Sequence, residues 1–134
     1  MAVDGLKLPQ KLPSSTHGVI VVLEGIHVPI DQVDTAPRSH ELNSYHYMAK
    51  PHEIRERIQQ ASIVVVVQAS ITSASLGEAP YLKFITVPGA GSDHIDLDEC
   101  RRRGIRVANP PGSTSPAAAE HCLRIRRYLF SPTV

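Results

Sequence analysis

Residues 84–96 read FITVPGAGSDHID: an apolar run ends in a Gly-x-Gly turn that leads into a helix start. A helix N-terminus presents unpaired backbone N–H groups and a partial positive charge, so this arrangement suits a small anion. A dinucleotide fingerprint would need a third glycine at position 94, which is His94, and Asp93 would place a negative charge beside a pyrophosphate. We therefore predict that the turn Gly89–Gly91 binds something smaller, such as a carboxylate.

Apolar runs upstream and downstream of this stretch indicate the rest of the sheet. Gly18–Leu23 and Ser62–Val67 are rich in β-branched residues, as is typical of strands that are buried on both faces of a parallel sheet. Shorter strands are expected at Ser44–Met48, Lys83–Val87 and Ile105–Ala108.

Helix signals alternate with these strands. Pro51 suits the first position of a helix over residues 51–60, and residues 25–43 and 71–79 are predicted as loops with a helical turn at most. Asp96 followed by Glu99 predicts a second helix start, and Gly104 predicts its end. A further helix is expected from Ser115.

The alternation of strands and helices predicts an α/β fold with a parallel sheet flanked by helices. We divide the chain into a flexible lead-in (residues 1–17), one sheet domain (18–112) and the beginning of a linking helix (113–134). Ligands of such sheets bind at the carboxyl ends of the strands, where Ser70, the turn Gly89–Gly91 and Asn109 are expected.

Composition narrows the class of protein. The chain has 134 residues, of which 42% are hydrophobic and 20% charged, as expected for one globular domain. The net charge of +1 argues against a dedicated nucleic-acid or membrane binder. Two cysteines without a C-x-x-C arrangement, and histidines without ligand spacing, predict neither a disulfide scaffold nor a zinc site. With no secretory signal evident, we expect a cytoplasmic protein.

Several blocks in sequence order carry a family resemblance. Residues 61–65 are followed by Ser70-Ile71-Thr72, then by Leu82–Asp96, by RGIRVANPPG at residues 103–112, and by Ala119-Glu120-His121. Together they resemble the substrate-binding (catalytic) domain of the D-isomer-specific 2-hydroxyacid dehydrogenases. The resemblance implies a flavodoxin-like domain that works beside a Rossmann domain carrying NAD or NADP.

The resemblance also implies roles for individual residues. Backbone N–H groups around Gly89, Ala90 and Gly91 would bind the substrate carboxylate, Ser70 would line the same pocket, and Asn109 would lie on the nicotinamide side. Many family members carry arginine just before that serine, whereas this chain has Ala69.

The family's cofactor fingerprint and its catalytic Arg, Glu and His match no position here. We therefore expect an incomplete domain that has little activity and binds no cofactor alone, and whose end reflects a truncated gene model, a splice product or a fragment. Its expected partners are a small 2-oxo or 2-hydroxy carboxylate and a second copy or a full-length homologue.

Two alternatives stay open beside the enzyme interpretation. The chain could be a carboxylate-binding or regulatory module that pairs with a full-length dehydrogenase. A receiver domain shares the expected strand order, and Glu24 follows the first strand, but Gln68 and Ala69 stand where the phosphoacceptor aspartate would be required.

Overall fold

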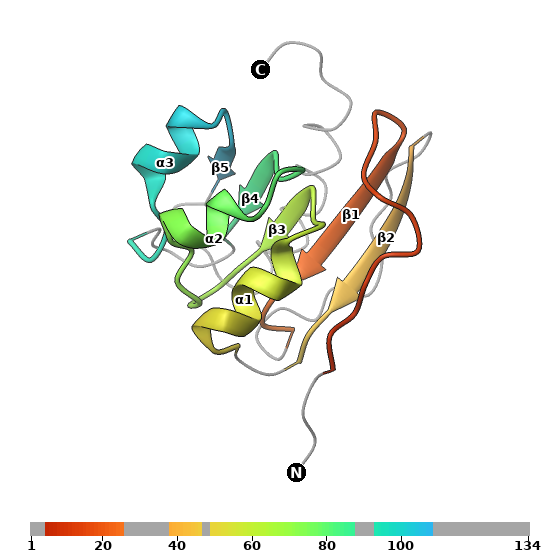
Figure 1. Cartoon of the computed structure of the whole chain (residues 1–134), viewed down its shortest axis with the longest axis horizontal. Coiled ribbons are helices and arrows are strands. Elements are labelled where there is room, and N and C mark those ends of the chain that lie inside the picture. The colour runs from red at the N-terminus through yellow and green to blue at the C-terminus, as the bar shows by residue number, and fades with distance from the viewer. Residues whose placement is uncertain (1–4, 26–37, 47–48, 88–92, 109–134) are drawn as a thin grey trace.

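The computed structural model describes residues 5–25, 38–46, 49–87 and 93–108, which form one sheet with three helices (Figure 1). The strands are β1 (His17–Val22), β2 (Ser39–Ser44), β3 (Ile63–Val65), β4 (Phe84–Thr86) and β5 (Arg106–Ala108). The helices are α1 (Pro51–Ile58), α2 (Ser73–Gly77) and α3 (Leu97–Arg102).

The sheet has the order β2-β1-β3-β4-β5, and every neighbouring pair is parallel. This is the flavodoxin-like order, in which the chain crosses from one side of β1 to the other after β2. The predicted α/β fold class is confirmed, and the carboxyl ends of all five strands share one edge of the sheet.

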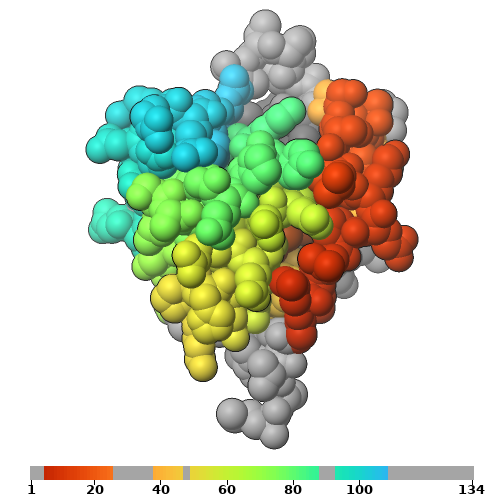
Figure 2. Space-filling view, in the orientation of Figure 1, coloured from red at the N-terminus to blue at the C-terminus, as the bar shows by residue number. Residues whose placement is uncertain are grey.

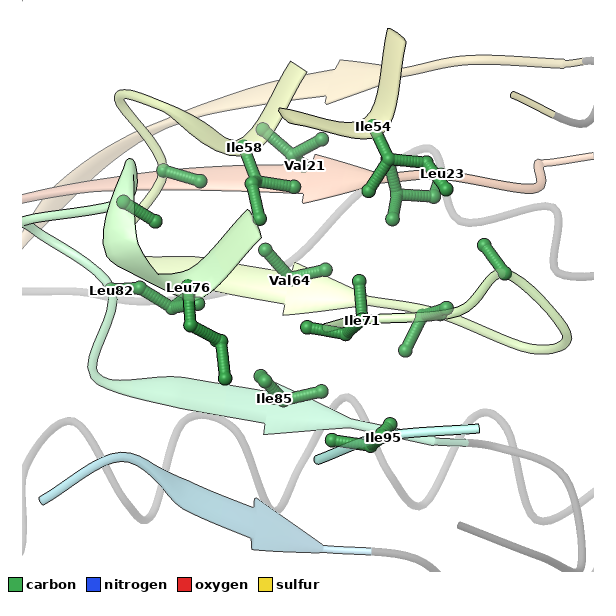
Figure 3. Close-up of a cluster of buried hydrophobic side chains, with 14 of the residues drawn as sticks. Val21, Leu23, Ile54, Ile58, Val64, Ile71, Leu76, Leu82, Ile85 and Ile95 are labelled. Atoms are coloured by element: carbon green, nitrogen blue, oxygen red, sulfur yellow. The ribbon is translucent and has the colours of Figure 1, made fainter. Parts of the chain in front are cut away.

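The two faces of the sheet carry separate apolar clusters because side chains alternate along each strand. On one face, Val21, Val64 and Ile85 are buried against the helices, as Figure 3 shows for the neighbouring Ile54, Ile58 and Leu76. The opposite face contributes a smaller cluster of Ile20, Val22, Ile63, Val65 and Phe84. This burial on both faces explains why β1 and β3 are continuous apolar runs.

All three helices lie over the first of these faces. Figure 1 shows them in front of the strands, and Figure 2 shows their side chains forming one continuous surface there. Burying a large aliphatic side chain such as Ile58, which is fully covered, stabilises the fold by about 1.5–3 kcal/mol. The helices therefore pack on this face of the sheet and stabilise the strands whose ends carry the loops.

Two predicted helix boundaries are confirmed in α3. The Asp96 carboxylate accepts a hydrogen bond from the backbone N–H of Glu99 at 3.1 Å, which caps the first turn. Gly104 follows the helix with a φ of 72°, a left-handed conformation that glycine adopts without strain. Pro51 likewise starts α1.

The second strand is not where the sequence pattern placed it. We expected a strand at Ser44–Met48 and a loop before it, whereas β2 spans Ser39–Ser44 and pairs with the whole of β1 from His17↔Ser39 to Val22↔Ser44. Its residues are mostly polar and half-buried, because an edge strand needs only one partner. Backbone pairing with β1, rather than side-chain alternation, determines this strand.

The described part of the lead-in lies against β2 and against Tyr45, the residue that follows it. The Glu41 carboxylate accepts hydrogen bonds from the backbone N–H groups of Gln10 (2.8 Å) and Lys11 (3.0 Å). The Lys7 backbone N–H donates to the Tyr45 hydroxyl at 2.8 Å. These contacts attach the lead-in to β2 and to Tyr45 through side-chain hydrogen bonds. The flexibility of the lead-in stays a prediction.

Candidate functional site

The candidate site lies at the carboxyl edge of the sheet, where the loop after β3 carries Ser70. Ser70 is exposed, whereas its neighbours Ala69 and Ile71 are buried. This alternation anchors the loop on both sides of the serine and leaves its hydroxyl facing outward from the core. Of the five predicted site residues, Ser70 is the one that the structure describes; Gly89, Ala90, Gly91 and Asn109 lie outside the described residues.

The loop before Ser70 is held by a buried carboxylate from another strand end. Glu24, which is 1% exposed, accepts hydrogen bonds from three consecutive backbone N–H groups. Its Oε2 lies 3.2 Å from the nitrogen of Val67 and 2.7 Å from that of Gln68, and its Oε1 lies 2.5 Å from that of Ala69. Charge-assisted bonds of this kind are about twice as strong as neutral ones, so they fix the path of the chain into Ser70.

A second anchor joins the Ser70 loop to the segment that follows β4. The Ile71 N–H donates to the His94 carbonyl oxygen at 2.9 Å, and the Asp96 N–H donates to the Ile71 carbonyl oxygen at 2.9 Å. Ile71 and Ile95 thus form a parallel bridge outside the main strands, and both side chains are buried. The bridge places Ser70 beside the segment into which the predicted Gly89–Gly91 turn leads.

The Ser70 loop leads directly into α2, and the segment after β4 leads directly into α3. Thr72 caps α2 by accepting from the Ser75 N–H at 3.3 Å, and Asp96 caps α3. Thr72 and Asp96 therefore serve local structure, whereas the exposed side chains of Gln68 and Ser70 in the loop after β3 remain accessible to a ligand.

His94 precedes α3, where a histidine that caps the helix or contacts solvent is the simplest expectation. The structure shows it half-buried, and among the described residues its Nε2 has no hydrogen-bond partner. Its ring makes no described contact with Ser70 or Glu24, so no acid–base role for it follows from the geometry.

The two α3 side chains with strongly shifted pKa values, Glu99 and Cys100, are not suited to catalysis. Hydrogen bonds from Arg102 and then Arg103 lower the pKa of Glu99 to about 2. Burial, followed by the charges of Asp96 and Glu99, raises the pKa of the Cys100 thiol to about 11. An acid this strong and a thiol this weak are unsuited to proton transfer or nucleophilic attack near neutral pH.

The described ranges contain neither a candidate metal site nor a candidate membrane span. In these ranges no group of three His, Cys, Asp or Glu side chains is placed to hold a metal ion. The helices found there are all too short or too polar to cross a bilayer.

Glu24 is the residue that sequence reasoning missed as part of the site. We weighed it as an acid of a receiver domain, but its carboxylate is occupied by the loop after β3. The available signal was an acidic residue directly after a strand buried on both faces. A charge placed there needs partners, and the free N–H groups of the neighbouring strand's loop are the nearest donors.

Comparison with known proteins shows one family for this chain. The profile of the D-isomer-specific 2-hydroxyacid dehydrogenase catalytic domain matches residues 20–129. A D-3-phosphoglycerate dehydrogenase of Archaeoglobus fulgidus is 35% identical over 78 residues, which cover 58% of this chain and 15% of that protein. A hydroxypyruvate reductase of Thermotoga maritima is 36% identical over 69 residues, covering 51% and 22%.

The fold is also shared with solved structures. The NAD⁺-bound 3-phosphoglycerate dehydrogenase of Entamoeba histolytica superposes with a TM-score of 0.60 at 24% identity, over 88% of this chain and 42% of that one. The chain thus spans less than half the length of this structure, and its matches cover less than a quarter of the two curated relatives.

Proposed function

Because the chain belongs to the D-isomer-specific 2-hydroxyacid dehydrogenase family, we propose that it is the substrate-binding part of an NAD(P)-dependent oxidoreductase acting on the CH–OH group of D-2-hydroxy acids. The observation that carries this proposal is the bridge between Ile71 and Ile95, which joins the Ser70 loop to the segment after the Gly-x-Gly turn. In the proposed site, Gly89, Ala90 and Gly91 donate backbone N–H groups to the substrate carboxylate.

The other proposed roles follow from position. The Ser70 hydroxyl can donate to the carboxylate or to the 2-oxo oxygen, and Glu24 keeps the loop before it in place. Asn109 is proposed to lie toward the nicotinamide. In the reaction, a hydride from the reduced cofactor would reach carbon 2 and a proton the oxygen, converting the 2-oxo acid to the 2-hydroxy acid. This chain would hold and orient the acid.

We propose that the 134-residue chain has no turnover and binds no nicotinamide cofactor by itself, because it contains no Gly-x-Gly-x-x-Gly fingerprint. The test adds NADH or NADPH and a panel of 2-oxo acids to the purified chain and follows absorbance at the nicotinamide band. No oxidation above the protein-free rate is expected. A steady, protein-dependent rate would contradict the proposal.

Carboxylate binding is tested separately from turnover. Calorimetric titration with hydroxypyruvate should give saturable binding to the wild-type chain. Ser70→Ala should weaken it about fivefold, the effect of losing one hydrogen bond of about 1 kcal/mol. Ser73→Ala, at the exposed start of α2, is the matched control and should change affinity less than twofold. No saturable binding, or equal affinity in both variants, would refute the proposed site.

The second candidate is a regulatory module that pairs with a full-length dehydrogenase of the family or with its own copy. It is favoured by the described residues themselves, which form a five-stranded sheet with a buried core. Sedimentation of the chain with a full-length family member should then show a complex. Independent sedimentation of the two species would exclude this role. For either function, we propose that the chain is located in the cytoplasm.

A further inference from the structure

Ser39, His17 and Glu41 form a connected row of polar side chains at the amino edge of the sheet. His17 begins β1 and Ser39 begins β2, and the two residues are register partners in this parallel pair. The His17 Nδ1 lies 2.7 Å from the Ser39 Oγ, and the His17 Nε2 lies 3.1 Å from the Glu41 Oε2. One imidazole ring therefore contacts a hydroxyl with one nitrogen and a carboxylate with the other. The proposed dehydrogenase site, at the carboxyl edge, does not use these residues.

The pairing of β1 with β2 explains why the three side chains meet. Side chains alternate along a strand, so Ser39 and Glu41 project from the same face of β2. The register aligns His17 with Ser39 and Val19 with Glu41, so a ring at position 17 can reach both polar side chains. The sequence alone does not reveal this cluster, because 22 residues separate His17 from Ser39 along the chain.

The Glu41 carboxylate determines which nitrogen of the neutral His17 ring carries the proton. An ionised carboxylate only accepts hydrogen bonds, so the Nε2 beside it must be the protonated nitrogen. Hydrogen bonds lower the pKa of Glu41, above all the bond from the Gln10 N–H, and they outweigh the opposing effect of burial. Glu41 is therefore ionised near neutral pH. The Nδ1 of the ring is then free of a proton and accepts the O–H of Ser39.

The exposure of the three side chains suits an attack by the serine. Ser39 is exposed, whereas the side chains of His17 and Glu41 are 7% and 23% exposed. Ser39 and His17 both belong to the described walls of a hollow of about 710 Å³, from which a small molecule can reach the hydroxyl. The Ser39 Oγ also lies 3.4 Å from the Thr16 carbonyl oxygen. The contact with His17 is much shorter, so the imidazole is the favoured acceptor of the hydroxyl proton.

We propose that Ser39 is a nucleophile for acyl transfer from small carboxylic esters, with His17 as its general base and Glu41 as the residue that positions His17. A serine beside a base that a carboxylate orients is the arrangement that activates serine in several unrelated folds. Esters are the expected class because an alcohol leaves an acyl group more readily than an amine does. This activity would need no nicotinamide cofactor and would be separate from the proposed oxidoreductase site.

The reaction has two steps, and each returns its proton. In the first, the Ser39 Oγ bonds to the carbonyl carbon of the ester and its proton passes to the His17 Nδ1. The bond to the alcohol oxygen then breaks, and the alcohol leaves with that proton. In the second, a water molecule attacks the acyl group on Ser39 and gives a proton to the same nitrogen. Ser39 recovers this proton as the acid leaves, so the net reaction is ester plus water to acid plus alcohol.

The first test treats the complete chain with a fluorophosphonate, which bonds its phosphorus to the oxygen of an activated serine and releases fluoride. We expect a single adduct, which mass spectrometry of peptides locates at Ser39. Ser39→Ala should not be labelled. The matched control Ser15→Ala alters another exposed serine in the walls of the same hollow and should be labelled at the wild-type rate. No adduct in the wild-type chain, or equal labelling of Ser15 and Ser39, would overturn the proposal.

The second test follows the hydrolysis of p-nitrophenyl acetate by the release of p-nitrophenolate. We expect saturable hydrolysis above the protein-free rate for the wild-type chain and its loss in Ser39→Ala. His17→Gln should lower kcat by at least about 100-fold, a usual contribution of a general base. Circular dichroism reports whether each variant is folded, and labelling of the wild-type chain decides where His17→Gln is not. Hydrolysis at the wild-type rate by a folded Ser39→Ala protein would refute the nucleophile.

The position of the ring proton tests the role of Glu41. Nitrogen-15 NMR at pH 8 should show that the His17 ring of the wild-type chain carries its proton on Nε2. Glu41→Gln keeps the shape of the side chain but removes the charge, and should lower kcat by at least about tenfold with KM unchanged. Glu56→Gln, on the exposed side of α1, should leave both constants unchanged. A proton on Nδ1 in the wild-type chain, or an unchanged kcat in folded Glu41→Gln, would refute the positioning role.

Discussion

The sharpest prediction concerns Glu24→Gln, which removes a buried charge and keeps the side-chain shape. In the native protein the 1% exposed carboxylate binds three consecutive N–H groups, with N···O distances of 2.5–3.2 Å. An amide offers one acceptor oxygen and presents an NH₂ group where the other oxygen was. At least one backbone N–H therefore faces a donor, whichever way the amide is turned.

The expected loss follows from that geometry. Leaving one buried donor unsatisfied costs about 1–3 kcal/mol, and the remaining bonds lose the contribution of the charge. We expect Glu24→Gln to lower the free energy of unfolding by about 2–4 kcal/mol, against a total of about 5–15 kcal/mol for a domain. The variant should therefore fold but unfold at lower urea concentration.

Urea unfolding followed by far-ultraviolet circular dichroism at pH 7 measures this difference. The matched control is Glu56→Gln on the exposed side of α1, which should change the free energy of unfolding by less than about 0.5 kcal/mol. Hydrogen exchange adds a local readout, since the Val67, Gln68 and Ala69 amides should exchange faster in Glu24→Gln. A Glu24→Gln protein as stable as the Glu56→Gln control would refute the reasoning.

Three further predictions concern α3 and its ends. Gly104→Ala should destabilise the protein by about 1–2 kcal/mol in urea, because the left-handed φ of 72° strains a Cβ that otherwise meets nothing within 4 Å. Arg102 and Arg103 depress the pKa of Glu99 from 4.5 to about 2, so the stability that Glu99 contributes is present above pH 4.5 and lost as the pH falls toward 2. Glu99→Gln should flatten that part of the stability–pH curve, and an unchanged curve would count against the ion pairs. The third prediction uses a chain in which Cys122 is replaced by serine. Its buried Cys100 thiol, whose pKa is raised to about 11, should resist a thiol reagent at pH 8 until urea is added. Rapid labelling of the native protein would contradict the burial of Cys100.

The parts of the fold that sequence reasoning predicted are those with a local physical signal. The apolar runs of β1 and β3 indicate burial on both faces, and the structure covers both faces. Asp96 and Gly104 were predicted as helix ends because capping and left-handed turns depend on residues only a few positions apart.

The parts that were not predicted depend on partners far along the chain. β2 is a mostly polar strand that pairs along its whole length with the backbone of β1, and no alternation of apolar side chains marks its position. The bonds of Glu24 reach 43 to 45 residues ahead, to a loop whose N–H groups look like any others in the sequence. Pattern reasoning can place a charge at a strand end, but it cannot identify the donors that neutralise that charge.

The position of Glu24 also restricts where a substrate anion can bind at the carboxyl edge. Three successive N–H groups aimed at one point form an anion site, and here a side chain of the protein already fills it. A substrate carboxylate must therefore take its donors from elsewhere, which favours the proposed turn Gly89–Gly91. Ser70 would then orient the substrate rather than neutralise it. It follows that Glu24→Gln should weaken hydroxypyruvate binding by loosening the loop that carries Ser70, whereas a direct contact of Glu24 with the anion would make the same change strengthen binding by removing a like charge.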